Sequence, residues 1–214
     1  MPLPFLSDAL WFPPVEKAAE DGLLAYGGDL RTERLLLAYR SGIFPWFNQD
    51  EPPLWWCPDP RCVIFPDELY ISKSMQQLLK RKAYSVTINR NFAAVIQQCA
   101  ATREEQEGTW ITTDIEEAYT ELHRLGYAVS IEAWQHDELV GGLYGIRIGN
   151  IFFGESMFSK VSNASKYAFI TYVQQLKKEG IVLIDCQIHT AHLESLGARM
   201  IPREEFLKIV KQNI

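Results

Sequence analysis

Residues 154–166 read GESMFSKVSNASK, and residues 183–187 read LIDCQ. The first segment places the carboxylate of Glu155 at the end of an apolar strand, and a helix starts behind it. The second segment is a short apolar strand on which Asp185 and Gln187, two residues apart, should share one face. A buried carboxylate is costly unless it is paired or functional. Polar side chains at the ends of two strands therefore predict a site rather than simple packing.

The surroundings of Glu155 leave two interpretations open. Its neighbours Phe152, Phe153, Met157 and Phe158 suit a mostly apolar pocket with one polar anchor. Such an anchor could bind the α-amino group of an amino acid that has a large apolar side chain. The alternative is a surface carboxylate beside a core strand, and the pattern fits both equally.

The rest of the chain predicts an α+β fold in which helices flank a mixed sheet. Residues 138–156 alternate as a β-hairpin that turns near Gly149 and Asn150. One helix should begin with a capping box formed by Thr113 and Glu116. Further strands are expected at residues 61–65, 84–89, 128–134 and 181–185. Helices are expected near residues 32–41, 72–82, 91–100, 113–126, 163–180, 190–198 and 201–210.

The first 60 residues differ from the remainder in composition. They hold nine of the eleven prolines and four of the six tryptophans. We expect a loop-rich segment around one helix, with residues 42–61 too rich in proline for regular structure. The chain should therefore comprise a small N-terminal domain over residues 1–60 and a mixed-sheet domain over residues 61–214.

Composition narrows the class of protein. The chain is 47% hydrophobic and 22% charged, the balance of an ordinary globular protein. It has neither an apolar run of about 18 residues, which a bilayer span needs, nor the pattern of a signal peptide, so we expect a cytoplasmic protein without membrane contact. Its four cysteines lack metal or disulfide spacing and should be reduced. His189 and His192 have only Asp185 and Cys186 close in sequence, so no metal or other cofactor is expected.

Charge is unevenly distributed on this acidic chain, whose net charge is −6. Residues 69–103 contain no Asp or Glu. A local basic surface of this kind can bind a polyanion, whereas the plainer interpretation is a solvated helix face. The basic residues of the stretch are Lys73, Lys80, Arg81, Lys82, Arg90 and Arg103.

Eleven segments, in order, resemble the leucyl/phenylalanyl-tRNA–protein transferase family over about residues 22–206. They read GLLAYGGDL, AYRSGIFPWF, LWWCPDPR, GTWIT, AYTELHRLGYAVSIE, LVGGLYG, FFGESMFS, NASK, LIDCQ, HLESLGA and IPREEF. The resemblance implies that the second domain is similar to GCN5-related N-acetyltransferases (GNAT-like). It also implies transfer of Leu or Phe, and less well Met, from aminoacyl-tRNA to the N-terminal Arg or Lys of proteins. The product would enter the bacterial N-end-rule degradation route, and nothing demands more than a monomer.

The resemblance also assigns roles residue by residue. It implies that Trp46 and Trp110 stack on the 3′ adenosine of the tRNA, and that Glu155 binds the donor amino group. Asp185 and Gln187 match the catalytic pair. The side-chain pocket would be lined by Leu143, Phe152, Met157, Tyr172 and Ile184. The tRNA backbone would contact Lys73, Lys80, Arg81, Lys82 and Arg90.

A neutral amide is a very poor proton acceptor, so the side chain of Gln187 does not suit the role of a general base. We therefore expect Gln187 to orient the carbonyl and the incoming amine, while Asp185 holds the cationic acceptor and takes or relays the proton. Two rival functions stay open. One is an N-acyltransferase that uses an acyl thioester, although the glycine loop of acetyl-CoA enzymes is missing. The other is a non-catalytic adaptor for basic N-termini.

Overall fold

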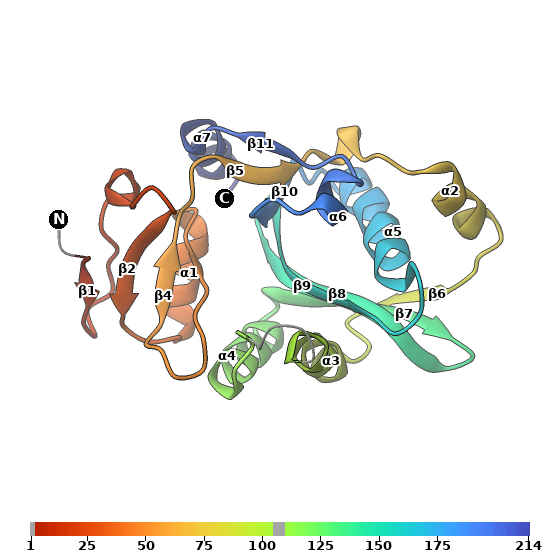
Figure 1. Cartoon of the computed structure of the whole chain (residues 1–214), viewed down its shortest axis with the longest axis horizontal. Helices are drawn as coiled ribbons and strands as arrows, with labels where there is room; N and C mark the ends of the chain where they lie inside the picture. The colour runs from red at the N-terminus through yellow and green to blue at the C-terminus, as the bar shows by residue number, and fades with distance from the viewer. Residues whose placement is uncertain (1–2, 105–109) are drawn as a thin grey trace.

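The computed structural model describes residues 3–104 and 110–214, the side chains of residues 103 and 104 excepted. Two sheets organise the chain, a small one near the N-terminus and a large one after it (Figure 1). The strands are β1 (Phe5–Leu6), β2 (Leu23–Gly27), β3 (Phe44–Pro45), β4 (Leu54–Trp56), β5 (Arg61–Ile64), β6 (Ser85–Ile88), β7 (Ala128–Gln135), β8 (Glu138–Ile148), β9 (Ile151–Ser159), β10 (Leu183–Gln187) and β11 (Arg199–Ile201). The helices are α1 (Thr32–Arg40), α2 (Lys73–Lys80), α3 (Phe92–Glu104), α4 (Thr113–Arg124), α5 (Ala164–Lys178), α6 (Ala191–Glu194) and α7 (Arg203–Asn213), with 3-10 turns η1 (Val15–Lys17) and η2 (Pro66–Glu68).

The small sheet has the strand order β1-β2-β4-β3. It corrects the expectation that residues 42–61 are irregular, because β3 and β4 lie within them. Pro45 is tolerated because β3 is an edge strand, where a missing N–H costs no ladder bond. Trp55 of β4 is fully buried, and its Nε1 donates to the carbonyl of Gly27 at 2.9 Å. The tryptophan thus serves as a packing anchor for this sheet.

The large sheet has the order β11-β5-β10-β9-β8-β7-β6 and confirms the expected mixed α+β architecture. Strands β8 and β9 form the predicted hairpin, and β9 pairs in parallel with β10. Helix α5 makes the crossover between those two strands and covers one face of the sheet, while α3 and α4 cover the other (Figure 1). Two hydrophobic clusters fill these faces. The segments quoted first in the sequence therefore lie side by side at the centre of the sheet.

Most helix boundaries agree with the sequence pattern, but the helix expected over residues 190–198 is only the short α6, and residue 201 belongs to β11 and not to the last helix. Asn91 caps α3, since its Oδ1 accepts from the N–H of Ala94 at 3.1 Å. For α4 the capping residue is Thr112, whose hydroxyl accepts from the N–H of Ile115, and not Thr113 as predicted. Adjacent threonines offer the same capping group, so the pattern alone misplaces the helix start by one residue. Among the described residues, no helix has both the length and the apolarity needed to cross a membrane.

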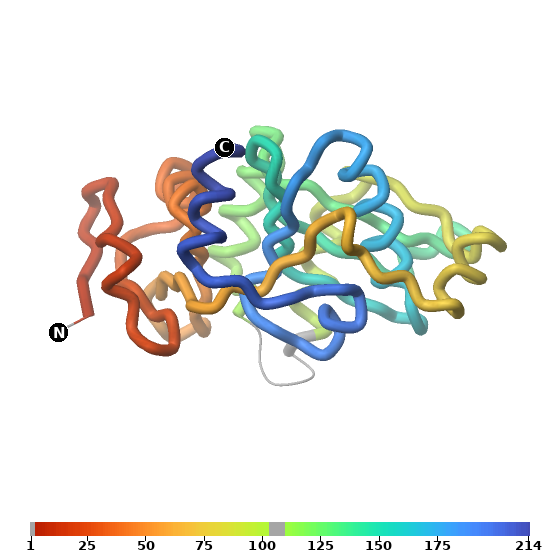
Figure 2. Tube along the Cα trace, turned by 90° about the horizontal axis from the view of Figure 1, so that it is seen from above, coloured from red at the N-terminus to blue at the C-terminus, as the bar shows by residue number. Residues whose placement is uncertain are grey.

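The last helix, α7, lies beside α1 in both views of the backbone (Figures 1 and 2). Gly42, just after α1, has φ +73°, and a Cβ there would approach Leu207 and Phe206 of α7 to within 3 Å. Phe206 is fully buried in the cluster that also contains residues of the small sheet. The C-terminal helix therefore joins the two sheets. We propose a domain boundary at residue 60, between β4 and β5.

This packing predicts that Phe206→Ala destabilises the whole protein. Removing a buried phenyl ring and leaving a cavity should lower the free energy of unfolding by ~3–5 kcal/mol. Urea unfolding followed by tryptophan fluorescence measures the change. The exposed Lys208, two residues along the same helix, supplies the control variant Lys208→Ala, which should shift the midpoint little. Equal midpoints for the two variants would show that α7 is not part of the core.

Candidate active site

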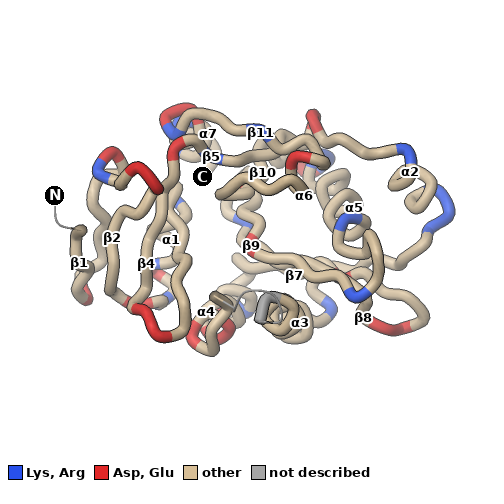
Figure 3. The backbone as a smooth tube through the Cα atoms, in the orientation of Figure 1, with Lys and Arg blue, Asp and Glu red and all other residues tan. Residues whose placement is uncertain are grey.

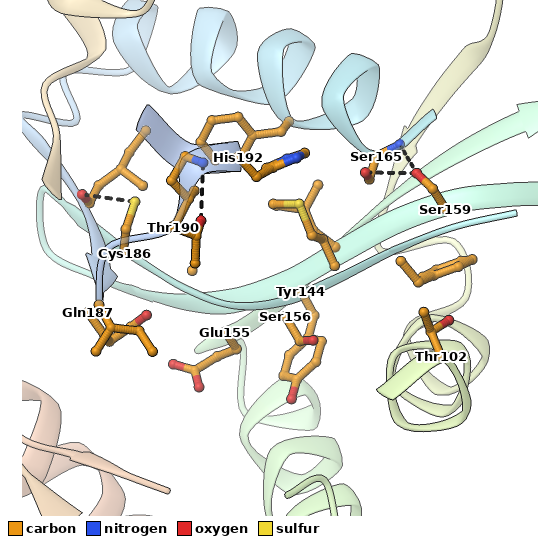
Figure 4. Close-up of a pocket in the computed structure, with 18 of the residues that line it drawn as sticks. Thr102, Tyr144, Glu155, Ser156, Ser159, Ser165, Cys186, Gln187, Thr190 and His192 are labelled. Atoms are coloured by element: carbon orange, nitrogen blue, oxygen red, sulfur yellow. Dashed lines mark hydrogen bonds between the residues drawn. The ribbon is translucent and has the colours of Figure 1, made fainter. Parts of the chain in front are cut away.

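A cavity of about 660 Å³ opens where β9 and β10 run side by side (Figure 4). Its walls come from both sheets, from α5 and from the segment that leads into α6. The lining residues are Phe44, Pro45, Trp46, Thr102, Trp110, Leu143, Tyr144, Gly154, Glu155, Ser156, Met157, Phe158, Ser159, Asn163, Ser165, Lys166, Phe169, Ile184, Cys186, Gln187, Ile188, Thr190, His192 and Leu193.

Glu155 is one of the residues that line this cavity (Figure 4). Its Oε1 accepts a hydrogen bond from the hydroxyl of Tyr39 at 2.7 Å, and its Oε2 accepts one from Tyr119 at 3.2 Å. The two tyrosine hydroxyls also contact each other. Burial raises the pKa of Glu155 to about 7, although the bond from Tyr39 opposes the rise. The structure therefore places Glu155 in a pocket and excludes the exposed surface carboxylate that the sequence had left open.

Tyr39 and Tyr119 come from α1 and α4, so elements from both parts of the chain hold this one carboxylate. Both rings are fully buried. Burial and the neighbouring carboxylate raise the pKa of each phenol well above its usual value, so both remain hydrogen-bond donors. Sequence reasoning missed these residues. The sequence gives little sign of their role, because a tyrosine on the apolar face of a helix is common in protein cores.

Gln187 lines the cavity, but Asp185 does not. The ladder between β10 and β5 shifts register between these two residues, and Gln187 has φ +57°. This bulge corrects the expectation that their side chains share one strand face, because an inserted residue breaks the period of two. Gln187 keeps a buried Nε2 with no hydrogen-bond partner in the described part of the chain.

Asp185 is fully buried and forms an ion pair with Arg61. Its Oδ1 accepts from Arg61 Nε at 2.8 Å, and its Oδ2 accepts from Arg61 Nη2 at 2.7 Å. The same Oδ1 accepts the backbone N–H of Gln187 at 3.0 Å. A carboxylate bound in this way has no free surface for an incoming amine. The expected direct contact of Asp185 with the acceptor does not fit this geometry.

The expected side-chain pocket is only partly at the cavity surface. Leu143, Met157 and Ile184 line it, together with Phe169 and Leu193, which the sequence did not single out. Phe152 and Tyr172 are buried behind the wall. Their rings pack edge to face at 5.2 Å. These two residues therefore support the wall and do not line the cavity.

Two tryptophans lie on the cavity lining, as expected. Trp46 is 42% exposed, and the Nε1 of Trp56 donates to its carbonyl oxygen at 2.7 Å. The ring centroids of Trp46 and Trp56 lie 5.7 Å apart in a tilted arrangement, so Trp56 packs against the exposed ring. Trp110 is half-buried and packs against the hydrophobic cluster. Both indoles are available as flat surfaces at the cavity.

The basic residues lie away from the cavity. Lys73 and Lys80 are on α2, with Arg81 and Lys82 directly after it (Figure 3). Arg90 lies over the ring of Trp134 at 4.4 Å. All five of these side chains are exposed, whereas the side chain of residue 103 lies outside the described residues. None of these five exposed side chains is among the residues that line the cavity.

The described residues contain no group of three or more His, Cys, Asp or Glu side chains arranged to hold a metal ion. The four cysteines are free and buried, as predicted. A hydrogen bond with Cys62, together with burial, raises the pKa of Cys186 well above its usual value, so this thiol on the cavity wall is a poor nucleophile at neutral pH.

The raised pKa of Glu155 predicts a pH-dependent effect of Glu155→Gln. Its usual pKa is 4.5 and its value in the folded protein is about 7. The folded state thus binds the extra proton, so stability falls as pH rises through this window. Gln is a neutral isostere, so the variant should be more stable than the parent at pH 8, by at most ~3 kcal/mol. At pH 4.5 the two should be nearly equal.

Thermal unfolding at both pH values measures this difference. The exposed Glu138 provides the control, since Glu138→Gln should change the melting temperature by a similar small amount at each pH. A stability gain for Glu155→Gln that is the same at pH 4.5 and pH 8 would contradict the burial of an ionisable group at this position.

Comparison with known proteins identifies the family. Residues 63–211 match the leucyl/phenylalanyl-tRNA protein transferase family, and residues 28–59 match its N-terminal domain. The leucyl/phenylalanyl-tRNA–protein transferase of Flavobacterium johnsoniae is 60% identical over 97% of this chain and 98% of its own length. The corresponding protein of Pseudomonas fluorescens strain Pf0-1 is 56% identical over 97% and 92%.

Solved structures give more distant likenesses. An aminoglycoside acetyltransferase from an uncultured soil metagenomic sample is 12% identical, with a TM-score of 0.41. The match covers 61% of this chain and 89% of the acetyltransferase. Likeness at this level carries no conclusion about chemistry or fold. The sequence matches cover nearly the whole chain at high identity, and on them the chain belongs to the leucyl/phenylalanyl-tRNA–protein transferase family of aminoacyltransferases.

Proposed function

We propose that this protein transfers Leu or Phe, and less well Met, from aminoacyl-tRNA to the N-terminal Arg or Lys of other proteins, as a cytoplasmic monomer. The observation that carries the proposal is the composition of one cavity. It combines a carboxylate held by two phenols, an apolar wall, an exposed indole and an unpartnered amide. An aminoacyl ester of adenosine presents one complementary group for each of them.

The donor would occupy the cavity as follows. Its α-ammonium group binds Glu155, and its side chain packs on Leu143, Met157 and Ile184. Its adenosine stacks on Trp46 or Trp110, and one such stack contributes ~1–3 kcal/mol without regard to base identity. The exposed cations on and after α2 would contact the tRNA phosphates, since backbone binding needs charge and not base readout.

The reaction is aminolysis of an ester. The neutral α-amine of the acceptor protein attacks the carbonyl carbon, the new C–N bond forms, and the C–O bond to the terminal ribose breaks. The amine loses one proton and the departing ribose oxygen gains one. An α-amine has a pKa of about 7.7–8.0, so roughly a tenth is already neutral at pH 7. Positioning can therefore supply much of the rate.

Gln187 suits the positioning role. Gln187 lines the cavity, and a rotation of its side-chain amide would bring the buried Nε2 to the carbonyl oxygen. A hydrogen bond donated there as negative charge develops lowers the barrier to acyl transfer. A newly added Leu or Phe at the N-terminus would then mark the acceptor protein for N-end-rule degradation.

The central test is transfer of labelled Phe from phenylalanyl-tRNA to a peptide that begins with Arg, with the N-acetylated peptide as control. Trp46→Ala should raise the KM for aminoacyl-tRNA by about 5–150-fold, which corresponds to one lost stack. Trp11 provides a matched control, because it is 41% exposed against 42% for Trp46 but does not line the cavity. Transfer to the acetylated peptide, or equal loss in both variants, would contradict the proposal.

The apolar wall predicts donor selectivity. Hydrophobic pockets distinguish one methylene by only about 1–3 kcal/mol, so Leu, Phe and Met should all be accepted. Ile and Val carry a branch at Cβ, close to the α-carbon that Glu155 and Gln187 hold, and should react about 10–200-fold more slowly. Competition between leucyl-tRNA and isoleucyl-tRNA measures the ratio. Equal transfer from both would refute the assignment of this wall to the side chain.

A further inference from the structure

We propose that Arg61 is a positioning residue for this reaction, and that it acts through Asp185 to hold Gln187 in its reactive orientation. The proposal rests on the proposed function and deepens it. It assigns Asp185 a structural contact in place of a proton-transfer step. It also gives a role to a buried arginine that lies 124 residues from its partner in sequence.

The backbone of Gln187 adopts an unusual conformation. Its φ of +57° is in the left-handed region, which residues with a side chain rarely adopt. The register shift in the β5–β10 ladder removes the regular strand pairing at this point. Its N–H donates instead to Oδ1 of Asp185. This side-chain contact therefore stabilises the turn that directs the amide of Gln187 into the cavity, together with the pairing of Gln187 with Cys62 on β5.

Arg61 holds Asp185 in its position. Arg61 binds both of its carboxylate oxygens, in a two-point geometry that fixes the plane of the carboxylate. Both side chains are almost completely buried, at 1% and 0% exposure. No rotation of Asp185 towards the cavity is possible without breaking this pair. The chain of contacts thus runs from Arg61 through Asp185 to the backbone of Gln187.

Two aromatic rings hold Arg61 in turn. Its guanidinium carbon lies 4.7 Å from the ring centroid of Phe44 and 4.6 Å from that of Phe206. Phe44 is on β3, directly before Pro45 and Trp46, which line the cavity. Arg61 therefore connects the wall that carries Trp46 with the wall that carries Gln187. Its placement sets the relative position of two groups that the proposed donor must meet at once.

A pair of double variants separates positioning from proton transfer. Arg61→Gln with Asp185→Asn removes both charges but keeps a hydrogen-bonded pair, and the amide introduced at position 185 retains an oxygen for the N–H of Gln187. Arg61→Met with Asp185→Leu removes the charges and that acceptor together. Replacing a buried ion pair by apolar residues of similar volume is often tolerated, so both variants should fold. Thermal unfolding verifies this for each.

The readouts are kcat and KM for phenylalanyl-tRNA with the Arg-starting peptide, and the pH profile of kcat. The amide pair should keep kcat within about 10-fold of the parent, with an unchanged pH profile, because the contact to Gln187 survives. The apolar pair should lose about 100-fold or more in kcat while KM changes little. This separation of kcat from KM is not expected of a general loss of stability.

Equal large losses in both folded double variants would overturn the proposal, because they would mean that the carboxylate itself is needed. A similar kcat close to that of the parent in both variants would overturn it as well, since the contact to Gln187 would then be dispensable. If the parent protein transfers no Phe to the peptide, the proposed function fails and this inference fails with it. If the parent is active and the two double variants give either of these results, only the role assigned to Arg61 is contradicted.

Discussion

The ion pair between Arg61 and Asp185 is the constraint on which the active site depends. Neither side chain reaches water, and taking each ion out of water costs several kcal/mol. Two short hydrogen bonds and two aromatic faces offset that cost. Losing one partner would leave an uncompensated buried charge, which destabilises a protein by about 3–5 kcal/mol. The pair therefore fixes β5, β10, β3 and α7 relative to one another at the cavity.

This pair also modifies the pKa of Glu155, which burial mainly determines. Asp185 raises the pKa of Glu155 and Arg61 lowers it, and both effects are smaller than that of burial. The neighbouring positive charge, that of Arg61, is paired with Asp185. Glu155 is left with two phenols, which donate hydrogen bonds but carry no charge. A half-buried carboxylate without a cation is suited to bind one, and under the proposed function the α-ammonium of an aminoacyl ester would be that cation.

The sequence pattern predicted elements that depend on neighbouring residues. It could not predict contacts between residues that lie far apart in the sequence. The hairpin and α5 follow from local alternation and apolar spacing, and both occupy the expected places. Glu155 and Gln187 line the cavity, but the pattern left the exposure of Glu155 open and predicted the wrong face for Gln187. Tyr39 lies 116 residues from Glu155, and Arg61 lies 124 residues from Asp185, so no local pattern could pair them. The bulge before Gln187 also escaped prediction, since a change of register leaves the alternation of residue types intact.

The proposed domain boundary at residue 60 is not a boundary of the site. Tyr39, Phe44 and Trp46 come from the first part, whereas Glu155 and Gln187 come from the second. An aminoacyl ester of adenosine spans both, because its base would stack on one wall and its amino group would bind the other. Rigid attachment of the two parts is then a condition for reaction, since a small displacement of either wall separates the carbonyl from Gln187. The buried contacts of α7 and Arg61 provide that attachment, so catalysis and stability share the same core.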